Sequence, residues 1–160
     1  MPATGPGDRP ATLEQLAALG ALIDRWAASQ REENDLFLNV EYQAEDHRWI
    51  VRLRGEEKAV IAVWLTLGQR TLHYESYFMP APEENVVACF EYLLRVNARL
   101  FALRFAIGPE DALYLLGQLP VGTVDEDHLD VIIGSVYAAS EQYFPAAMSI
   151  GYESKYRRRA

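Results

Sequence analysis

The stretch from residue 48 to residue 82 constrains the fold most, because it contains three strand-like runs separated by two short polar turns. The turns, at residues 55–58 and 68–70, each contain a glycine. Connections this short join antiparallel neighbours, since parallel strands need a crossover of about a dozen residues or more. The three runs are Arg48–Arg54, Ala59–Leu67 and residues 71–79. The sequence therefore predicts an antiparallel meander that forms the floor of one small domain.

Inward and outward residues alternate along the first and third runs, as expected of half-buried strands. In the first run, Trp49, Val51 and Leu53 lie on one side, opposite Arg48, Ile50, Arg52 and Arg54. In the third run, Leu72, Tyr74 and Phe78 lie opposite His73, Glu75 and Tyr77. The central run is apolar on both sides, with Ile61, Val63 and Leu65 opposite Val60 and Trp64. It is therefore predicted to be an interior strand covered on both faces.

A helix and a shorter strand are predicted before the meander. Thr12 and Gln15 form a capping-box pattern that opens a helix over Thr12–Ser29. A strand follows at Leu36–Tyr42, although an extended loop would have the same pattern. Alternation along this strand predicts that Leu36, Leu38 and Val40 face inward.

A second helix is predicted to begin at Pro82 and to continue to Arg99 or Leu100. Proline suits the first helical position, and Glu83 and Glu84 would complement the positive end of the helix. The residues predicted to be buried are Val86, Val87, Phe90, Leu93, Leu94 and Asn97, with Cys89 packed beside them.

Two strands and a long helix complete the chain. The strands are predicted at Ala102–Ile107 and Ala112–Leu119. The helix spans Val124–Ile150, with Asp125 as its cap and Pro145 as a residue that kinks or ends it. The strands cluster and the helices lie at the N-terminus, the middle and the C-terminus. This order predicts a single α+β domain with a mostly antiparallel sheet.

Composition limits the compartment and the partners. The domain is predicted at 12–151, between a flexible segment at 1–11 and a basic tail at 152–160. The chain carries a net charge of −8, and without that tail it has 11 basic and 22 acidic residues, a net charge of −11. This excess argues against nucleic-acid binding. One cysteine, no signal-like leader and no long apolar run indicate a cytoplasmic protein with no membrane segment.

Motifs for catalysis, metals or cofactors are missing from the sequence. It contains no phosphate-binding glycine loop, no paired cysteines and no serine elbow. His73 and Glu75 share one face of a strand, but zinc or iron would need a further ligand. Polar residues on a solvent-exposed face explain this pair more simply. We therefore predict no enzyme activity, no metal and no cofactor.

The better functional candidate is a surface rich in aromatic and arginine side chains. Tyr and Trp suit protein interfaces, because they bury a large area and keep a polar group. The same aromatic residues could instead form the core. Asn97, on an apolar helical stripe, is predicted to bond a neighbouring backbone edge. The predicted interaction residues are Arg52, Arg54, Trp64, His73, Tyr74, Tyr77, Arg95 and Asn97.

Several motifs resemble those of the YbjN family and cover most of residues 36–151. They include RTL at 70–72, PAPEEN at 80–85, LLRVNARL at 93–100, RFAIG at 104–108, YLLGQLP at 114–120 and LDVIIG at 129–134. Thirteen arginines against two lysines are typical of an actinobacterial member. The resemblance implies a fold similar to that of type III secretion chaperones, which are acidic proteins that dimerise and hold partner segments in extended form. It supplies no catalytic residues, and the family is described as sensory-transduction regulators.

The residues and the resemblance together predict a non-enzymatic protein-binding module, chaperone-like or regulatory, that acts as a homodimer. The alternative is a small-molecule sensor with a pocket between the second helix and the sheet, near Tyr74, Arg95 and Asn97.

Overall fold

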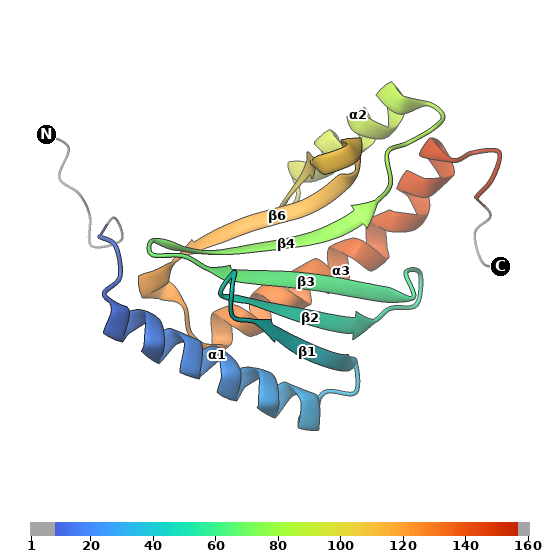
Figure 1. The fold of residues 1–160 in the computed structure, drawn as a ribbon. Helices are drawn as coiled ribbons and strands as arrows, with labels where there is room; N and C mark the ends of the chain where they lie inside the picture. The colour runs from blue at the N-terminus through green and yellow to red at the C-terminus, as the bar shows by residue number, and fades with distance from the viewer. Residues whose placement is uncertain (1–8, 157–160) are drawn as a thin grey trace, which may run out of the picture.

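The computed structural model describes residues 9–156, which form three α-helices, six β-strands and two short 3-10 helices (Figure 1). The helices and strands, in chain order, are α1 (Leu13–Glu33), β1 (Phe37–Gln43), β2 (Arg48–Arg54), β3 (Val60–Leu67), β4 (Thr71–Met79), α2 (Val86–Asn97), β5 (Arg104–Ile107), β6 (Leu113–Pro120) and α3 (Glu126–Gly151).

The strands form one antiparallel sheet in the order β1-β2-β3-β4-β6-β5. Strands β1 to β4 are a meander whose turns return the chain directly to the neighbouring strand. After β4 the chain forms α2, continues into the edge strand β5, and returns as β6 beside β4. The predicted α+β fold with a mostly antiparallel sheet is therefore confirmed.

The two faces of the sheet differ in what covers them. One face, which we call the inner face, is buried against all three helices and includes Val51, Leu65 and Leu115, each fully buried. In Figure 1, α3 lies behind the strands and α1 runs beside β1. No described helix covers the opposite face, which we call the outer face. Its side chains are half-buried or exposed, apart from Ile50, which lies between its cross-strand neighbours.

The predicted orientation of the first strand is wrong at its start and right from Val40 onward. Leu36 and Leu38 are exposed, whereas Phe37 is buried and its ring meets Trp26 of α1 edge-on. Val40 packs against the core opposite Val51, as predicted. The register of β1 against β2 shifts between Phe37 and Asn39, and such a bulge shifts the side-chain alternation, so alternation assigned the wrong face only before it.

The start and the buried side of the second helix are also corrected. The helix begins at Val86, and Pro82 lies in the preceding loop. Glu83 and Glu84 are therefore not in its first turn; their backbone N–H groups donate to the carbonyl oxygen of Gly151 at the end of α3. The buried residues of α2 are Cys89, Leu93 and Val96.

Helix α3 crosses the inner face of the sheet, and its bounds lie within two residues of those predicted. The Asp125 side chain caps it by accepting from the His128 N–H at 2.8 Å, as expected. The helix does not end at Pro145 but continues to Gly151, after which Tyr152 donates its hydroxyl to the carbonyl of Ala81. The loop before α2 thus holds the C-terminal end of α3.

Candidate protein-binding surface

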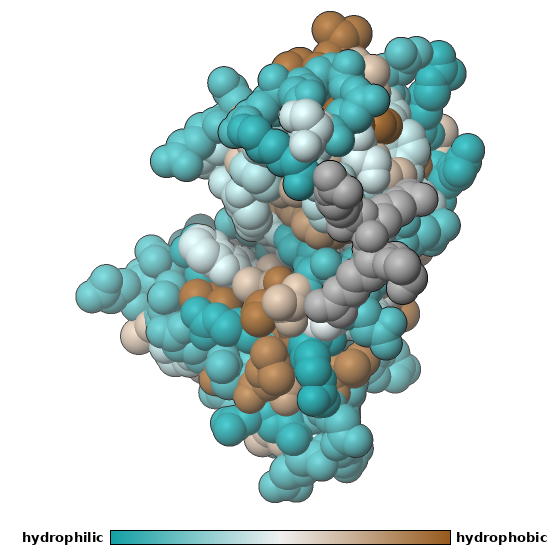
Figure 2. Space-filling view, turned by 90° about the vertical axis from the view of Figure 1, so that its right-hand side faces the viewer, coloured by the Kyte–Doolittle hydropathy of each residue, from teal (hydrophilic) through white to brown (hydrophobic). Residues whose placement is uncertain are grey.

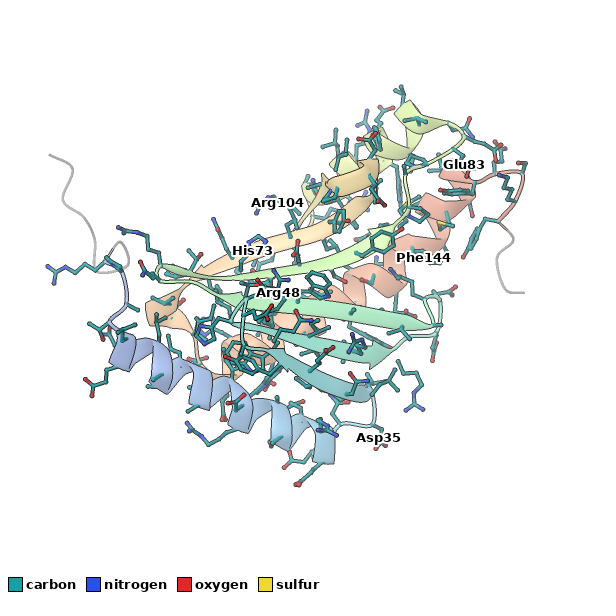
Figure 3. The ribbon with its side chains drawn as sticks, viewed as in Figure 1. Asp35, Arg48, His73, Glu83, Arg104 and Phe144 are labelled. Atoms are coloured by element: carbon teal, nitrogen blue, oxygen red, sulfur yellow. The ribbon has the colours of Figure 1, made fainter. Side chains whose placement is uncertain are left out.

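The strand register defines which residues share the outer face. Two rows run across the sheet: Gln43, Arg48, Thr66, His73 and Gln118; and Glu41, Ile50, Trp64, Glu75, Leu116 and Arg104. Beside them, Asn39, Arg52 and Ala62 are in register on β1 to β3, and Tyr77, Tyr114 and Ala106 are in register on β4, β6 and β5. Arg54 and Val60 extend the face at one end. In Figure 3, Arg48, His73 and Arg104 lie over the strands on the side opposite α3.

This side of the molecule is hollowed. Figure 2 turns the molecule so that the front of Figure 1 becomes the left-hand outline, and that outline is indented between an upper and a lower lobe. The central strands of the sheet, β3 and β4, run between the two lobes. The outer face is therefore a shallow, concave surface.

Two large aromatic side chains on this surface remain accessible to solvent. Trp64 is 38% exposed and Tyr77 is 47% exposed, and Val60 on the same face is exposed too. The prediction that the central run is covered on both faces is therefore wrong for the single chain. The apolar outer side of β3 has the composition of a buried strand without a helix to bury it.

Arginines flank the aromatic side chains. The guanidinium of Arg48 lies 4.6 Å from the centre of the Trp64 ring, and its Nε donates to Thr66 Oγ1 at 2.9 Å. Arg52 donates from Nη1 to Asn39 Oδ1 and to Glu41 Oε2, both at 3.1 Å. Cation–π contact and hydrogen bonds thus order these side chains on an otherwise open face.

Lys58 lies at the boundary between the outer face and the core. Its Nζ donates to the carbonyls of Tyr77 at 2.8 Å and Phe78 at 2.7 Å, and it lies over the rings of Tyr77, Phe78 and Phe144. Burial lowers the pKa of Lys58 from 10.5 to about 8, and the charge of Glu141 partly opposes this effect. Glu141 of α3 also accepts from three backbone N–H groups at residues 56–58, so the β2–β3 turn is anchored to α3.

Tyr74 is not on the surface to which the sequence assigned it. Its side chain is 1% exposed on the inner face, and its hydroxyl donates to the carbonyl of Ala102 at 2.7 Å. Gly117 lies opposite it on β6, where an added Cβ would come within 2.2 Å of the Tyr74 ring. A glycine inside a strand indicates this kind of close approach. Gly117 was therefore the feature of the sequence that indicated a side chain packed against β6.

Arg95 and Asn97 are also separate from the outer face. Arg95 is exposed on α2, where it pairs with Glu91 at 2.7 Å. The Asn97 side chain donates to the carbonyl of Phe105 and accepts from its N–H, at 3.2 and 2.7 Å. The prediction that Asn97 bonds a neighbouring backbone edge is confirmed. Arg52, Arg54, Trp64, His73 and Tyr77 share the outer face; Tyr74, Arg95 and Asn97 do not.

The sequence analysis missed an exposed apolar surface on α2 and β5. Because α2 is apolar around most of its circumference, its periodicity did not reveal which side faces solvent. Val87 is 80% exposed and Leu94 is 67% exposed, although both were predicted to be buried. We call Val87, Phe90, Leu94 and Ile107 the α2 patch. Phe90 and Leu94 line both an open groove along α2 and a pocket of about 250 Å³ against β5 and β6.

A metal or catalytic centre finds little support. Within residues 9–156, no three His, Cys, Asp or Glu side chains are grouped closely enough to hold a metal ion. His73 and Glu75 lie on the outer face, beside Gln118 and Leu116 respectively on the neighbouring strand. Cys89 is buried, and burial raises the pKa of its thiol. None of the helices between residues 9 and 156 is long and apolar enough to span a bilayer.

Comparison with known proteins identifies relatives by sequence. The model of the YbjN family, described as "Putative bacterial sensory transduction regulator", matches residues 23–148. An uncharacterized protein of Mycobacterium leprae is 30% identical over 107 residues, which cover 67% of this chain and 58% of the relative. One from Mycobacterium tuberculosis is 31% identical over 109 residues, covering 68% and 60%. The chain thus matches only about 60% of the length of these relatives.

Solved structures share the fold at low sequence identity. The Yersinia pestis type III secretion chaperone SycH, in complex with a fragment of YscM2, has a TM-score of 0.53 at 16% identity, covering 76% of this chain and 96% of that chain. A chain of the HopA1–SchA chaperone–effector complex has a TM-score of 0.55 at 10% identity, covering 82% and 95%. A chain of the ExsC–ExsE complex has a TM-score of 0.55 at 16% identity, covering 78% and 92%. At these identities the likeness concerns the fold alone.

Proposed function

The chain belongs to the YbjN family, and on that premise we propose that it is a non-enzymatic, chaperone-like or regulatory module of the cytoplasm that binds a protein partner as a homodimer. The observation that carries the proposal is the uncovered outer face of the sheet. Trp64, Tyr77 and Val60 are exposed there. Aromatic side chains of this kind contribute most of the energy at protein interfaces.

The shared fold gives independent support to protein binding. The neighbours SycH and the HopA1–SchA assembly were solved as complexes of a chaperone with another protein. A fold does not fix a function, so the argument depends on the exposed surface of this chain. The curved outer face presents both apolar rings and hydrogen-bonding groups, which is the mixture found in protein interfaces.

The α2 patch is the surface that we assign to the homodimer. Its apolar residues are flanked on α2 by Glu91 and Arg95. A two-fold axis brings the same patch of both subunits together, so every contact between two different residues occurs twice. Two α2 helices packed antiparallel would place Glu91 of one copy toward Arg95 of the other. An antiparallel pair of α2 helices would therefore bring opposite charges together beside the apolar residues of the patch.

Site-specific crosslinking tests the partner surface. With a photoreactive phenylalanine at Tyr77, we expect a discrete partner protein to be crosslinked in cells. The same group at Leu13 of α1, which is more exposed, should crosslink no such band. Trp64→Ala, added to the Tyr77 probe, should remove the band. Equal labelling from Tyr77 and Leu13 would refute the assignment of the outer face.

Light scattering tests the homodimer. The chain has a mass of 18.1 kDa, and we expect a particle of twice that mass. Leu94→Asp places a charge at the centre of the α2 patch and should give a monomer, because burying an unpaired carboxylate at an interface is costly. Leu13→Asp is the matched control on α1. A wild-type protein that is monomeric at all concentrations would contradict this part of the proposal.

Small-molecule sensing is the second candidate. The pocket of about 250 Å³ between α2 and β5–β6 is lined by Phe90, Leu93, Leu94, Phe105, Ala106, Ile107 and Leu113. Ligand pockets combine an apolar lining with a few convergent polar groups, and these side chains offer none. Tyr74, Arg95 and Asn97 do not line it. A metabolite that raises the melting temperature in a saturable way would favour this candidate.

A further inference from the structure

We propose that the outer face binds an extended, acidic segment of the partner protein, lying along β3 and β4. This inference rests on the proposed function and adds the chemistry and conformation of the bound segment. It follows from three features of the outer face: its charge, the availability of its arginines, and its shape.

The outer face has the opposite charge to the rest of the chain. It carries four arginines, Arg48, Arg52, Arg54 and Arg104, against two glutamates, Glu41 and Glu75. Outside this face, 11 basic residues remain against 21 acidic ones. A positive surface on an acidic protein attracts acidic partners and repels basic ones.

Two of these arginines, Arg52 and Arg104, are available to a partner. Arg48 is paired with Asp46 at 3.7 Å, and Arg54 donates to the carbonyl of Asp35 at 2.6 Å. No group within residues 9–156 forms a hydrogen bond or an ion pair with the guanidinium of Arg104, which is exposed. Arg52 and Glu41 form a pair in which both side chains are more than a third exposed. Exposed ion pairs contribute little to stability, so a carboxylate of a partner can replace Glu41 at little cost.

The shape favours an extended segment. The edge-on outline of the outer face is indented in Figure 2, and Trp64 and Tyr77 lie on its central strands, β3 and β4. Outward side chains on a strand recur at about 6.6 Å, which is also the repeat of alternate side chains in an extended peptide. Acidic side chains of the segment would meet the arginines of β2 and β5 at the sides, and its apolar side chains would meet the two aromatic rings.

Other occupants fit less well. The basic tail at 152–160 has the wrong charge for this face. A second copy of the chain is acidic, but the α2 patch lies on a different part of the molecule and offers it a more apolar surface. Single-stranded nucleic acid is anionic and stacks on aromatic rings. Its affinity depends, however, on many Lys and Arg contacts to phosphates, and this face offers four arginines.

Fluorescence anisotropy with labelled probes tests the inference. The probes are a short unstructured peptide rich in glutamate with interspersed tyrosines, the same peptide with lysine in place of glutamate, and a single-stranded oligonucleotide. We expect saturable binding of the acidic peptide alone, weakening as salt is added. Arg52→Gln with Arg104→Gln should weaken it about tenfold. The control Arg25→Gln with Arg31→Gln removes the same charge from exposed positions on α1 and should leave affinity unchanged.

Each outcome has a defined meaning. Equal binding of the acidic and basic peptides, or equal loss in both double variants, would overturn the acidic-segment inference. Tighter binding of the oligonucleotide than of the acidic peptide would overturn the inference in favour of a nucleic-acid partner. Failure of these probes while the Tyr77 crosslink persists would refute this inference and leave the proposed function intact. Loss of the crosslink as well would refute both. Circular dichroism melting confirms that each variant is folded.

Discussion

The inner and outer faces of the sheet are made by the same strands but differ in whether their apolar residues are buried. On β3, Ile61, Val63 and Leu65 are fully buried, whereas Val60 and Trp64, which alternate with them, are exposed. The strand is therefore apolar on both sides and covered on one. Burial accounts for the first set as part of the core. The second set has no such explanation within one chain, which is why we assign it to binding.

The largest expected effect contrasts Leu65 with Trp64. Leu65→Ala leaves a cavity in the core and should lower the free energy of unfolding by about 2–5 kcal/mol. Trp64→Ala removes more atoms, but from a surface already in contact with water, and should cost less than about 1 kcal/mol. Urea denaturation of both variants measures the difference. A Trp64 variant as unstable as the Leu65 variant would mean that the outer face contributes to folding as the core does.

A second prediction concerns pH, because Lys58 lies at the boundary between the outer face and the core and has a lowered pKa. Its pKa is about 8 in the folded chain and 10.5 ordinarily. The unfolded chain therefore binds more protons between these values, and stability should rise by about 2 kcal/mol from pH 8 toward pH 10. Lys58→Met should be more stable at pH 7 and lose this rise.

Tyrosines limit the pH window. Burial raises the pKa of both Tyr74 and Tyr77, so their contribution to stability falls once the pH exceeds their ordinary value of 10.0. Urea denaturation at intervals from pH 7 to about pH 10 isolates the lysine effect. The same slope in the Lys58→Met variant would show that another group is responsible.

The smallest expected effect is on the outer face itself. Arg48→Lys keeps the charge but loses the planar stacking on Trp64 and the Nε donation to Thr66. We expect a loss of about 0.5 kcal/mol in stability, since exposed cation–π contacts are weak. Tryptophan fluorescence and urea denaturation report it together. A loss of several kcal/mol would mean that the pair belongs to the core.

Element order, the meander and the faces of β2 and β4 could be predicted because short turns and strict alternation leave few alternatives. The inward side of α3 also followed from its periodicity, with Leu129, Ile132 and Val136 buried as expected. Local pattern was enough in these segments because each buries a single apolar stripe against one neighbour.

The remaining features depend on contacts that local pattern does not contain. The bulge in β1 reversed its alternation, and only pairing with β2 reveals it. In α2, Val87 and Leu94 are as apolar as Leu93, so composition did not distinguish the buried side. Alternation placed Tyr74 on the side of Leu72 and Phe78, but only the structure shows that Gly117, more than 40 residues later, makes room for its ring. Five of the predicted residues, Arg52, Arg54, Trp64, His73 and Tyr77, lie on the outer face. That no described helix covers this face could be learned only from the arrangement of all three helices.

The amide of Asn97 has a consequence for assembly. It occupies both outward backbone groups of Phe105, in the middle of the edge strand β5. An edge satisfied by the chain's own side chain cannot recruit another sheet through a ladder of main-chain hydrogen bonds. In the homodimer that we propose, association at the neighbouring α2 patch would proceed through side chains about a two-fold axis, which closes after two copies.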